Sequence, residues 1–197
     1  MAIAKRSGAS RASSVQRFVE DKVTRRATLV LIKPDAIKRR LAGAVLTRLE
    51  ELGLELVGAK AAHVGRELAE EHYKPLRGEP FYDELIRYIC GKLHGVNYVL
   101  ALVYVGPDAI ARVRQLAGAT NPEAADPTSI RGALGRITTT GLMENILHAS
   151  SDEQEAEREI QLWFRPEELL RPFHPKTVEP PRMRLSAPMI AGQAGGA

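Results

Sequence analysis

Two continuous apolar runs constrain what this chain can fold into more than any other feature. They cover Ala27–Ile32 and Tyr98–Val105, and their aliphatic and β-branched residues are typical of buried strands. Each run is followed by a helical pattern and then by another strand-like segment. Two such split units predict an α/β (α+β) sandwich of the ferredoxin-like βαββαβ type, a four-stranded antiparallel sheet with helices packed on one face.

The other elements follow from hydrophobic spacing and from the residues at their ends. Gly53 ends the first amphipathic helix as a C′ residue, and Pro107 opens the helix after the second apolar run. Ser151 and Gln154 have the spacing of a capping box before the last helix. The expected helices are Ala42–Leu52, Arg66–Tyr73, Pro80–Ile89, Pro107–Leu116 and Asp152–Phe164, and the remaining strands are Leu54–Val64 and Asn145–His148.

Charge divides the chain into a mildly acidic centre and two basic ends. Residues 1–26 contain seven Lys or Arg against two acidic residues, and residues 171–197 contain four against one; the net charge of +4 therefore leaves −4 for residues 27–170. We predict a flexible basic N-terminal tail (1–25), one globular domain (26–170) and a Pro/Gly-rich C-terminal arm (171–197). A transit peptide at the start and an arm packed on a neighbouring subunit are the alternatives.

Composition favours a cytoplasmic protein with neither a membrane nor a nucleic-acid partner. No stretch approaches the roughly 20 apolar residues that span a bilayer, and Cys90, the single cysteine, cannot form an internal disulfide. The acidic centre lacks the basic face of nucleic-acid-binding domains. Both common glycine-rich phosphate loops are absent, so side chains would have to hold any nucleotide phosphate.

His148 is the most reactive candidate, because it ends a short apolar strand between small residues. Neutral imidazole suits general-base or covalent catalysis near pH 7. Glu159 borders the apolar stripe of the next helix, so its carboxylate can turn back and fix the tautomer of the imidazole. A capping or half-buried histidine and an ion pair at the edge of the core are the structural alternatives.

Side chains that could bind phosphate flank a long turn-rich segment, Gly118–Met143. Lys33 ends the first strand, Arg114 precedes the segment, and Thr120 and Arg131 lie inside it. Guanidinium groups and hydroxyls bind phosphate well, although each cation taken alone is more often a solvated or ion-paired surface charge. The segment is too long for an idle connection and is interpreted as a binding loop.

Seven short motifs, in order, make residues 26–170 similar to nucleoside diphosphate kinases. They are Leu31–Asp35, His72-Tyr73, Pro80-Phe81, Thr120–Pro122, Ile130–Gly132, Glu144–Ser150 and Glu159–Phe164. The resemblance implies a transferase of nucleotide metabolism that moves the γ-phosphate of a nucleoside triphosphate, typically ATP, to a nucleoside diphosphate in a ping-pong reaction. It also implies Mg²⁺ bound mainly through the nucleotide phosphates, with no protein metal ligand, and a homo-oligomer, either a hexamer or a tetramer.

The resemblance further implies which side chains bind the nucleotide. Lys33 and Asn145 would contact the ribose hydroxyls, with Lys33 also near the γ-phosphate. Arg114, Thr120 and Arg131 would hold the β- and γ-phosphates.

The remaining implied roles concern the phosphate-carrying group and the base. His148 would be the nucleophile and become a phosphohistidine at its pros nitrogen. Tyr73 would reach the phosphate and His148, while Ser150 and Glu159 would support His148. Phe81 would stack on the base.

The chain departs from the family pattern at several places. Ala133 stands where an aspartate is usual, Ala36–Arg40 replaces a glycine-containing stretch, and extra residues occur near Gly91–Val96 and Thr138–Gly141. These changes predict altered kinetics or assembly and leave the implied catalytic set in place. The rival hypothesis is a kinase-like regulatory or nucleic-acid-binding protein that acts through its basic tails. A ferredoxin-like RNA-binding domain is a weaker one, because Tyr98–Val105 lacks the aromatic and basic pattern such domains use.

Overall fold

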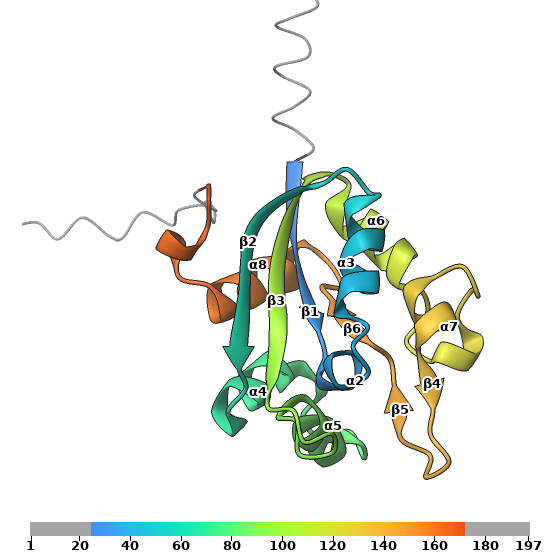
Figure 1. The fold of residues 1–197 in the computed structure, drawn as a ribbon. Coiled ribbons are helices and arrows are strands. Elements are labelled where there is room, and N and C mark those ends of the chain that lie inside the picture. The colour runs from blue at the N-terminus through green and yellow to red at the C-terminus, as the bar shows by residue number, and fades with distance from the viewer. Residues whose placement is uncertain (1–24, 172–197) are drawn as a thin grey trace, which may run out of the picture.

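A computed structural model describes residues 25–171, so almost all of the predicted tail and arm lies outside the described residues. Figure 1 shows a central antiparallel sheet flanked by helices. The elements are β1 (Arg25–Ile32), α2 (Pro34–Lys38), α3 (Ala42–Glu50), β2 (Glu55–His63), α4 (Arg66–His72), η1 (Lys74–Leu76), α5 (Tyr82–Ile89), β3 (Tyr98–Pro107), α6 (Ala109–Ala117), η2 (Pro122–Ala124), α7 (Ile130–Leu134), β4 (Arg136–Ile137), β5 (Met143–Glu144), β6 (Leu147–Ala149), α8 (Glu153–Trp163) and η3 (Pro166–Glu168).

The sheet has the strand order β2-β3-β1-β6, and every pairing in it is antiparallel. β1 is central: Leu29 pairs with Val103 of β3, and Leu31 pairs with His148 of β6. This arrangement confirms the predicted ferredoxin-like sheet. It also places His148 on an edge strand beside the end of β1.

The prediction that the helices cover one face of the sheet is wrong, because they cover both. Leu29 and Leu31 of β1 pack with α4, α5 and α8, whereas Val30 and Ile32 pack with α3 and α6. A strand with apolar residues at successive positions sends them to opposite faces, and each face then needs a cover. The continuous apolar run therefore reflects burial on two sides.

Three helix starts differ from the predictions, and α5 begins at Tyr82 where Pro80 was expected. The N-cap of α8 is Asp152, whose carboxylate accepts the backbone N–H of Glu155 at 2.9 Å, while the Ser151 hydroxyl donates to Asp152. Pro107 belongs to the end of β3, since it still pairs with Arg25, and Asp108 is the N-cap of α6. Gly53 has a left-handed φ of +59°, but it lies two residues after Glu51, the C-cap of α3, because the helix ends at Glu50 and not at Leu52.

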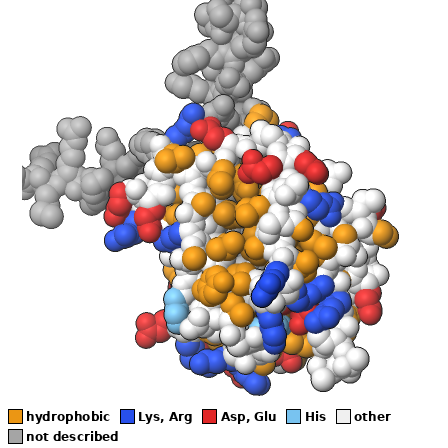
Figure 2. Space-filling model, viewed as in Figure 1, with side chains coloured by type: hydrophobic (Ala, Val, Ile, Leu, Met, Phe, Trp, Pro, Cys, Tyr) orange, Lys and Arg blue, Asp and Glu red, His pale blue; other side chains and the backbone are white. Residues whose placement is uncertain are grey.

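The exposed edge of β2 is partly paired by the segment after α8. The backbone N–H of Leu170 donates to the carbonyl oxygen of Val57 at 2.8 Å, where a bulge interrupts the pairing of β2 with β3. Figure 2 shows apolar side chains gathered on the face formed by β2, β3 and α3. Among residues 25–171, no helix has the length and apolar character needed to cross a bilayer.

Candidate active site

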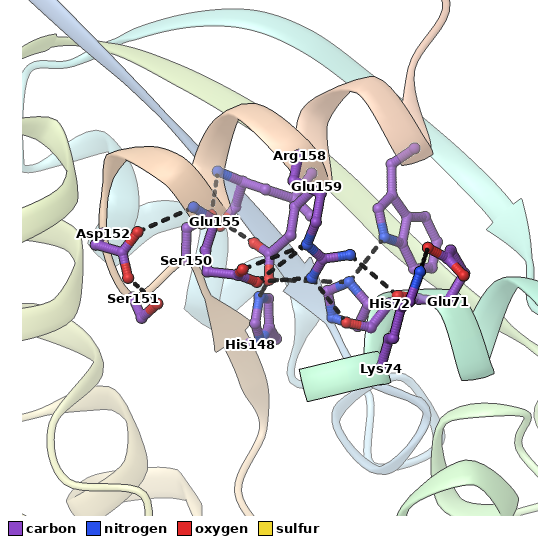
Figure 3. Close-up of polar contacts among 12 residues, drawn as sticks. Glu71, His72, Lys74, His148, Ser150, Ser151, Asp152, Glu155, Arg158 and Glu159 are labelled. Carbon is purple, nitrogen blue, oxygen red and sulfur yellow. Dashed lines mark hydrogen bonds and ion pairs between the residues drawn. The ribbon is translucent and has the colours of Figure 1, made fainter. Parts of the chain in front are cut away.

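The sheet determines where the side chain of His148 points. Leu147 and Ala149, its neighbours in β6, are buried against the α3 and α6 side. Because successive side chains alternate between faces, the imidazole of His148 points toward α8 (Figure 3). Its side chain is 18% exposed, so the ring is surrounded mostly by protein and remains accessible to a ligand.

Glu159 approaches His148 from α8, as predicted. It is only 3% exposed, and Oε1 of its carboxylate lies 2.9 Å from Nε2 of His148. The two atoms are in contact without the alignment of a hydrogen bond. Nδ1 of His148 has no hydrogen-bond partner among residues 25–171. The contact with Nε2 thus leaves Nδ1 available as a nucleophile.

Ser150 holds the second oxygen of this carboxylate. Its hydroxyl donates to Oε2 of Glu159 at 2.6 Å and accepts the backbone N–H of Leu29 at 3.1 Å. Burial raises the pKa of Glu159 above its usual value. Because the Ser150 hydroxyl is uncharged, it orients the carboxylate without cancelling its negative charge, which stays available to the imidazole.

A second histidine, His72 at the end of α4, was given no role by the sequence analysis. It is 2% exposed, and its ring meets that of His148 edge-on at a centroid distance of 4.5 Å. Nδ1 of His72 accepts a hydrogen bond from Nε1 of Trp163 at 3.1 Å. Burial, and then the neighbouring His148, lower the pKa of His72 well below 6.5. An uncharged ring therefore packs beside the candidate nucleophile; the His72-Tyr73 motif was its sole signal in the sequence.

These side chains bring three metal-binding atoms together, because ligand atoms of His72, His148 and Glu159 lie within 4.8 Å of one another. The Trp163 N–H occupies the lone pair of Nδ1 in His72. The neutral ring must then carry its proton on Nε2 and has no free lone pair for a metal. The group is suited to orienting His148 and poorly suited to metal binding.

Arg158 fixes α8 relative to α4. Its guanidinium donates to the carbonyl oxygens of Glu71 at 3.0 Å and His72 at 2.9 Å, and it pairs with Glu155 at 2.7 Å (Figure 3). These contacts hold the helix that carries Glu159 against the helix that carries His72.

The predicted ribose-binding residues Lys33 and Asn145 contact each other. Nζ of Lys33 donates to Oδ1 of Asn145 at 2.7 Å, and Nδ2 of Asn145 donates to the carbonyl oxygen of Thr120 at 3.1 Å. The Lys33 ammonium also lies 5.3 Å from the centre of the Tyr88 ring. Both Lys33 and Asn145 are buried, so their polar groups form one fixed unit.

A strained turn at Ile146 connects this unit to β6. Ile146 has a φ of +71°, which is rare for a β-branched residue, and the Leu147 N–H donates to the carbonyl oxygen of Asn145 at 2.7 Å, closing a γ-turn. The Ile146 N–H donates to Asp35 at 3.0 Å, and its carbonyl accepts the Lys33 N–H at 2.9 Å. Such a conformation costs about 1–3 kcal/mol and persists only when its surroundings impose it. The predicted strand Asn145–His148 therefore begins later, at Leu147.

Arg131 ties the predicted binding loop to β6. Its guanidinium donates to the carbonyl oxygens of Gly118 at 2.8 Å, Leu147 at 2.9 Å and Asn145 at 3.3 Å. The N-cap Ser129 sets the start of α7 and accepts the Gly132 N–H at 3.1 Å. The structure thus brings Thr120, Arg131 and Asn145 together, although they are distant in sequence.

The electrostatics of the site indicate an excess of positive charge. Burial, and then Arg131, lower the pKa of Lys33 to about 7. Burial lowers the pKa of Arg131, with a further contribution from Arg114. Burial, followed by Lys33 and Arg131, lowers the pKa of His148 to about 3. Burial is the largest cause of each shift, and neighbouring cations add to it, so a bound anion would oppose part of the shift. The low pKa of His148 keeps its ring neutral at physiological pH.

The other predicted residues surround this centre at different depths. Tyr73 is buried with its ring perpendicular to that of His148 at 6.3 Å, and its hydroxyl has no hydrogen-bond partner within the described range. Arg114 of α6 and Thr120 are exposed. Phe81, the N-cap of α5, is 51% exposed, so its ring is open to a ligand.

Sequence comparisons point in the same direction as this geometry. Residues 26–169 match the family described as nucleoside diphosphate kinase. A nucleoside diphosphate kinase of Pyrococcus furiosus is 44% identical over 142 residues, covering 72% of this chain and 84% of that protein. One from Staphylococcus aureus is 46% identical over 142 residues, covering 72% of this chain and 89% of its own length.

Solved structures are similar in fold as well as in sequence. A halophilic nucleoside diphosphate kinase from Halobacterium salinarum in complex with CDP has a TM-score of 0.67 and 41% identity, covering 75% of this chain and 93% of that one. The enzyme from Borrelia burgdorferi, a transition-state mimic with bound vanadate and ADP, has a TM-score of 0.68 and 34% identity, covering 77% and 94%.

Proposed function

This chain belongs to the nucleoside diphosphate kinase family, and we propose that it transfers the γ-phosphate of a nucleoside triphosphate, typically ATP, to a nucleoside diphosphate through a phosphohistidine on His148. As a member of this family it is a phosphotransferase that acts on nucleotides. One observation carries the assignment of the residue: Oε1 of Glu159 lies 2.9 Å from Nε2 of His148 and leaves Nδ1 free.

In the first half-reaction, neutral Nδ1 attacks the γ-phosphorus. A nitrogen–phosphorus bond forms, the bond to the β–γ bridging oxygen breaks, and the nucleoside diphosphate leaves with that electron pair. The ring gains positive charge, which the buried carboxylate of Glu159 stabilises through Nε2. In the second half-reaction, a terminal oxygen of another diphosphate takes the phosphoryl group, and the neutral imidazole is regenerated.

Phosphoryl transfer depends mainly on positioning and on neutralising charge. Lys33, Arg114 and Arg131 would supply that charge around the phosphates, with Thr120 adding a hydroxyl donor. Burial, and then nearby guanidinium groups, lower the pKa values of Lys33 and Arg131; a bound polyphosphate would stabilise both buried charges, which supports this role.

The rest of the nucleotide has partners of matching chemistry. Lys33 and Asn145 would contact the ribose hydroxyls as a hydrogen-bonded pair. The exposed ring of Phe81 would stack on the base, a contact that barely discriminates among bases. The buried hydroxyl of Tyr73, which has no partner among residues 25–171, would donate to the phosphate next to His148.

The side chains around the candidate phosphate site also fit Mg²⁺ that enters with the nucleotide. Of the buried carboxylates nearest the site, Glu159 is engaged by Ser150 and His148, whereas Asp35 accepts the Ile146 N–H through Oδ2 and its Oδ1 has no hydrogen-bond partner among residues 25–171. One free carboxylate oxygen is too few to hold the metal by itself, so phosphate and water oxygens would supply most of its ligands. When bound, Mg²⁺ supplies charge neutralisation on the phosphates.

A homo-oligomer, either a hexamer or a tetramer, is the assembly we propose. The face formed by β2, β3 and α3 carries partly buried leucines and two exposed alanines (Figure 2): Leu46, Leu56, Leu100, Ala59 and Ala61. Contiguous apolar surface of this kind marks interaction sites.

The single cysteine, Cys90, fits a reducing cytoplasm.

Labelling with γ-³²P-ATP tests the phosphohistidine directly. The wild-type chain should take up label that is lost in acid and retained in alkali, and ADP should remove it. His148→Gln should take up none, whereas the matched control His63→Gln, at an exposed histidine on β2, should label normally. Label on His148→Gln at the wild-type level would contradict the proposal, and an unlabelled wild-type chain would favour a role for the basic tails instead.

A further inference from the structure

A second buried histidine–glutamate pair lies behind the candidate nucleotide site. His94 is 6% and Glu144 is 5% exposed, and Nε2 of His94 lies within hydrogen-bond distance of Oε1 of Glu144, at 3.1 Å. Since a carboxylate only accepts, the ring nitrogen is the donor. Nε of Arg136 donates to the other oxygen of Glu144 at 2.7 Å, and Arg39 lies 3.7 Å from it.

This pair connects the two stretches where the chain is longer than the family pattern. His94 lies in the extra segment Gly91–Val96, and Glu144 ends the β4–β5 hairpin that contains Thr138–Gly141. The first segment has a defined shape: Gly91 has a φ of +74°, a Cβ there would lie 1.6 Å from the Val96 carbonyl oxygen, and the Gly95 N–H donates to the Gly91 carbonyl at 2.8 Å. His94 is thus presented by a tight turn.

Two routes lead from the pair to the hydrogen-bonded unit of Lys33 and Asn145. Along the chain, Glu144 directly precedes Asn145, so fixing its side chain fixes the start of the strained turn. Through space, the His94 ring packs edge-on against Tyr88 at 5.0 Å, and the same Tyr88 ring lies 5.3 Å from Nζ of Lys33. Both routes reach the Lys33–Asn145 hydrogen bond of 2.7 Å.

We propose that His94 and Glu144 are positioning residues that hold Lys33 and Asn145 in place to recognise the ribose hydroxyls. The inference rests on the proposed function, because it needs those two residues to contact the sugar. Among the described residues, neither His94 nor Glu144 has a hydrogen bond, ion pair or ring contact with His148, Arg114 or Arg131. Because Lys33 also serves the phosphates whereas Asn145 contacts only the sugar, loss of His94 or Glu144 weakens sugar recognition more than it slows phosphoryl transfer at His148.

The test compares acceptors that differ in a single hydroxyl. Values of kcat/KM are measured with ATP as donor and either a 2′-deoxynucleoside diphosphate or its 2′,3′-dideoxy analogue as acceptor. In wild type, the ratio of the two values reports the contact with the 3′-hydroxyl. His94→Leu and Glu144→Gln should each reduce this ratio by about 3- to 10-fold, the size of one misplaced hydrogen bond. The dideoxy acceptor, which lacks the 3′-hydroxyl contact, should lose less activity than the 2′-deoxy acceptor.

Three controls make the result specific. His94→Gln keeps an N–H donor for Glu144 and should restore the wild-type ratio. The exposed residues His63 and Glu51, changed in His63→Leu and Glu51→Gln, should leave it unchanged. If His94→Leu fails to fold in thermal melts, Glu144→Gln alone decides.

The possible outcomes separate the two proposals. The positioning role would be overturned if kcat/KM fell equally with both acceptors, or if the ratio of the two kcat/KM values stayed unchanged in both variants. The proposed kinase activity would stand in either case. A wild-type chain without transfer activity would instead overturn the proposed function.

Discussion

Glu159 and Glu144 are both buried carboxylates with a histidine nitrogen at a similar distance, 2.9 Å for His148 and 3.1 Å for His94. They differ in their second partner. Ser150, a neutral donor, binds Glu159, whereas Arg136, a cation, binds Glu144. Burial raises the pKa of Glu159. Burial acts in the same direction on Glu144, but hydrogen bonds from Arg136 and His94 prevail and lower its pKa.

The difference separates a reactive pair from a structural one. A carboxylate held by a hydroxyl keeps its negative charge for the positive charge that develops on a phosphorylated imidazole. A carboxylate already paired with a guanidinium has little left for such a charge. His148 is 18% exposed on its side chain and His94 is 3% exposed, so a ligand can reach His148 alone.

The largest expected effect comes from exchanging the two histidines for glutamine. His148→Gln should lower the rate of transfer between ATP and a diphosphate by at least about 10⁴-fold, because the attacking nitrogen is lost. His94→Gln should stay within about threefold of wild type, since an N–H donor remains for Glu144. Steady-state kinetics of both variants provide the measurement. Similar losses of transfer rate in the two variants would contradict the division into a reactive pair and a structural pair.

Lys33 tests how much positive charge contributes to nucleotide binding. Its pKa of about 7 in the free protein means that much of the ammonium is deprotonated at pH 8. A bound polyphosphate favours the charged form, so binding at pH 8 should take up protons, and less uptake should occur at pH 6, where Lys33 is already charged.

Isothermal titration calorimetry in buffers of different ionisation enthalpy measures that uptake. Lys33→Met should abolish it and weaken nucleotide binding by about 10- to 100-fold, the worth of a charge-assisted hydrogen bond. Uptake that persists in Lys33→Met would assign the proton to another group.

The two glutamates should affect stability with opposite dependence on pH. The pKa of Glu144 is lower in the folded state than in the unfolded state. Its contribution to the free energy of unfolding is therefore fully present above the unfolded-state pKa, and it disappears as pH falls through the folded-state pKa. Because that of Glu159 is raised, stability decreases as pH rises through the interval between the unfolded and folded values.

Denaturant unfolding at pH 7 and pH 4 checks these signs. At pH 7, Glu144→Gln should cost about 1–3 kcal/mol. Glu159→Gln should be neutral or slightly stabilising while slowing transfer. A large loss of stability in Glu159→Gln would show that its charge supports the fold.

The smallest effect on the transfer rate is expected at Trp163, which holds the neutral ring of His72 beside His148. Trp163→Phe removes the donor to Nδ1 of His72 and should cost about 1–3 kcal/mol, since a buried acceptor is left unpaired. Transfer should fall less than threefold. Thermal unfolding and kinetics measured together distinguish this support from a direct role in catalysis.

The sequence predicted the elements whose signal is local. The runs Ala27–Ile32 and Tyr98–Val105 are β-strands, and Glu159 lies at the border of the apolar stripe of α8 as its spacing indicated. Pro107 was misplaced, because strand pairing with Arg25 outweighs its preference for a helix start. Asp152 replaced Ser151 as the cap, because its carboxylate is the group that reaches the N–H of the third helical residue.

What the sequence could not reveal depends on contacts between distant residues. His72 and His94 gain their roles from Trp163 and Glu144, which are 91 and 50 residues away along the chain. The left-handed conformation of Ile146 opposes the local preference of a β-branched residue, so no pattern could indicate it. The resemblance identified the candidate nucleophile, whereas the surroundings that keep it neutral required the fold.

The pairing of β6 with β1 has a consequence for how this protein forms. Lys33 and Asn145 are separated by 112 residues, and Leu29 and Ser150 by 121. The site is therefore completed only when β6 pairs with β1, a long-range and entropically costly step. A ligand that binds only the closed chain shifts this equilibrium by mass action. Bound nucleotide would then stabilise the folded state as well as serve as a substrate. A growing chain would bind it only after α8, which carries Glu159, has been synthesised.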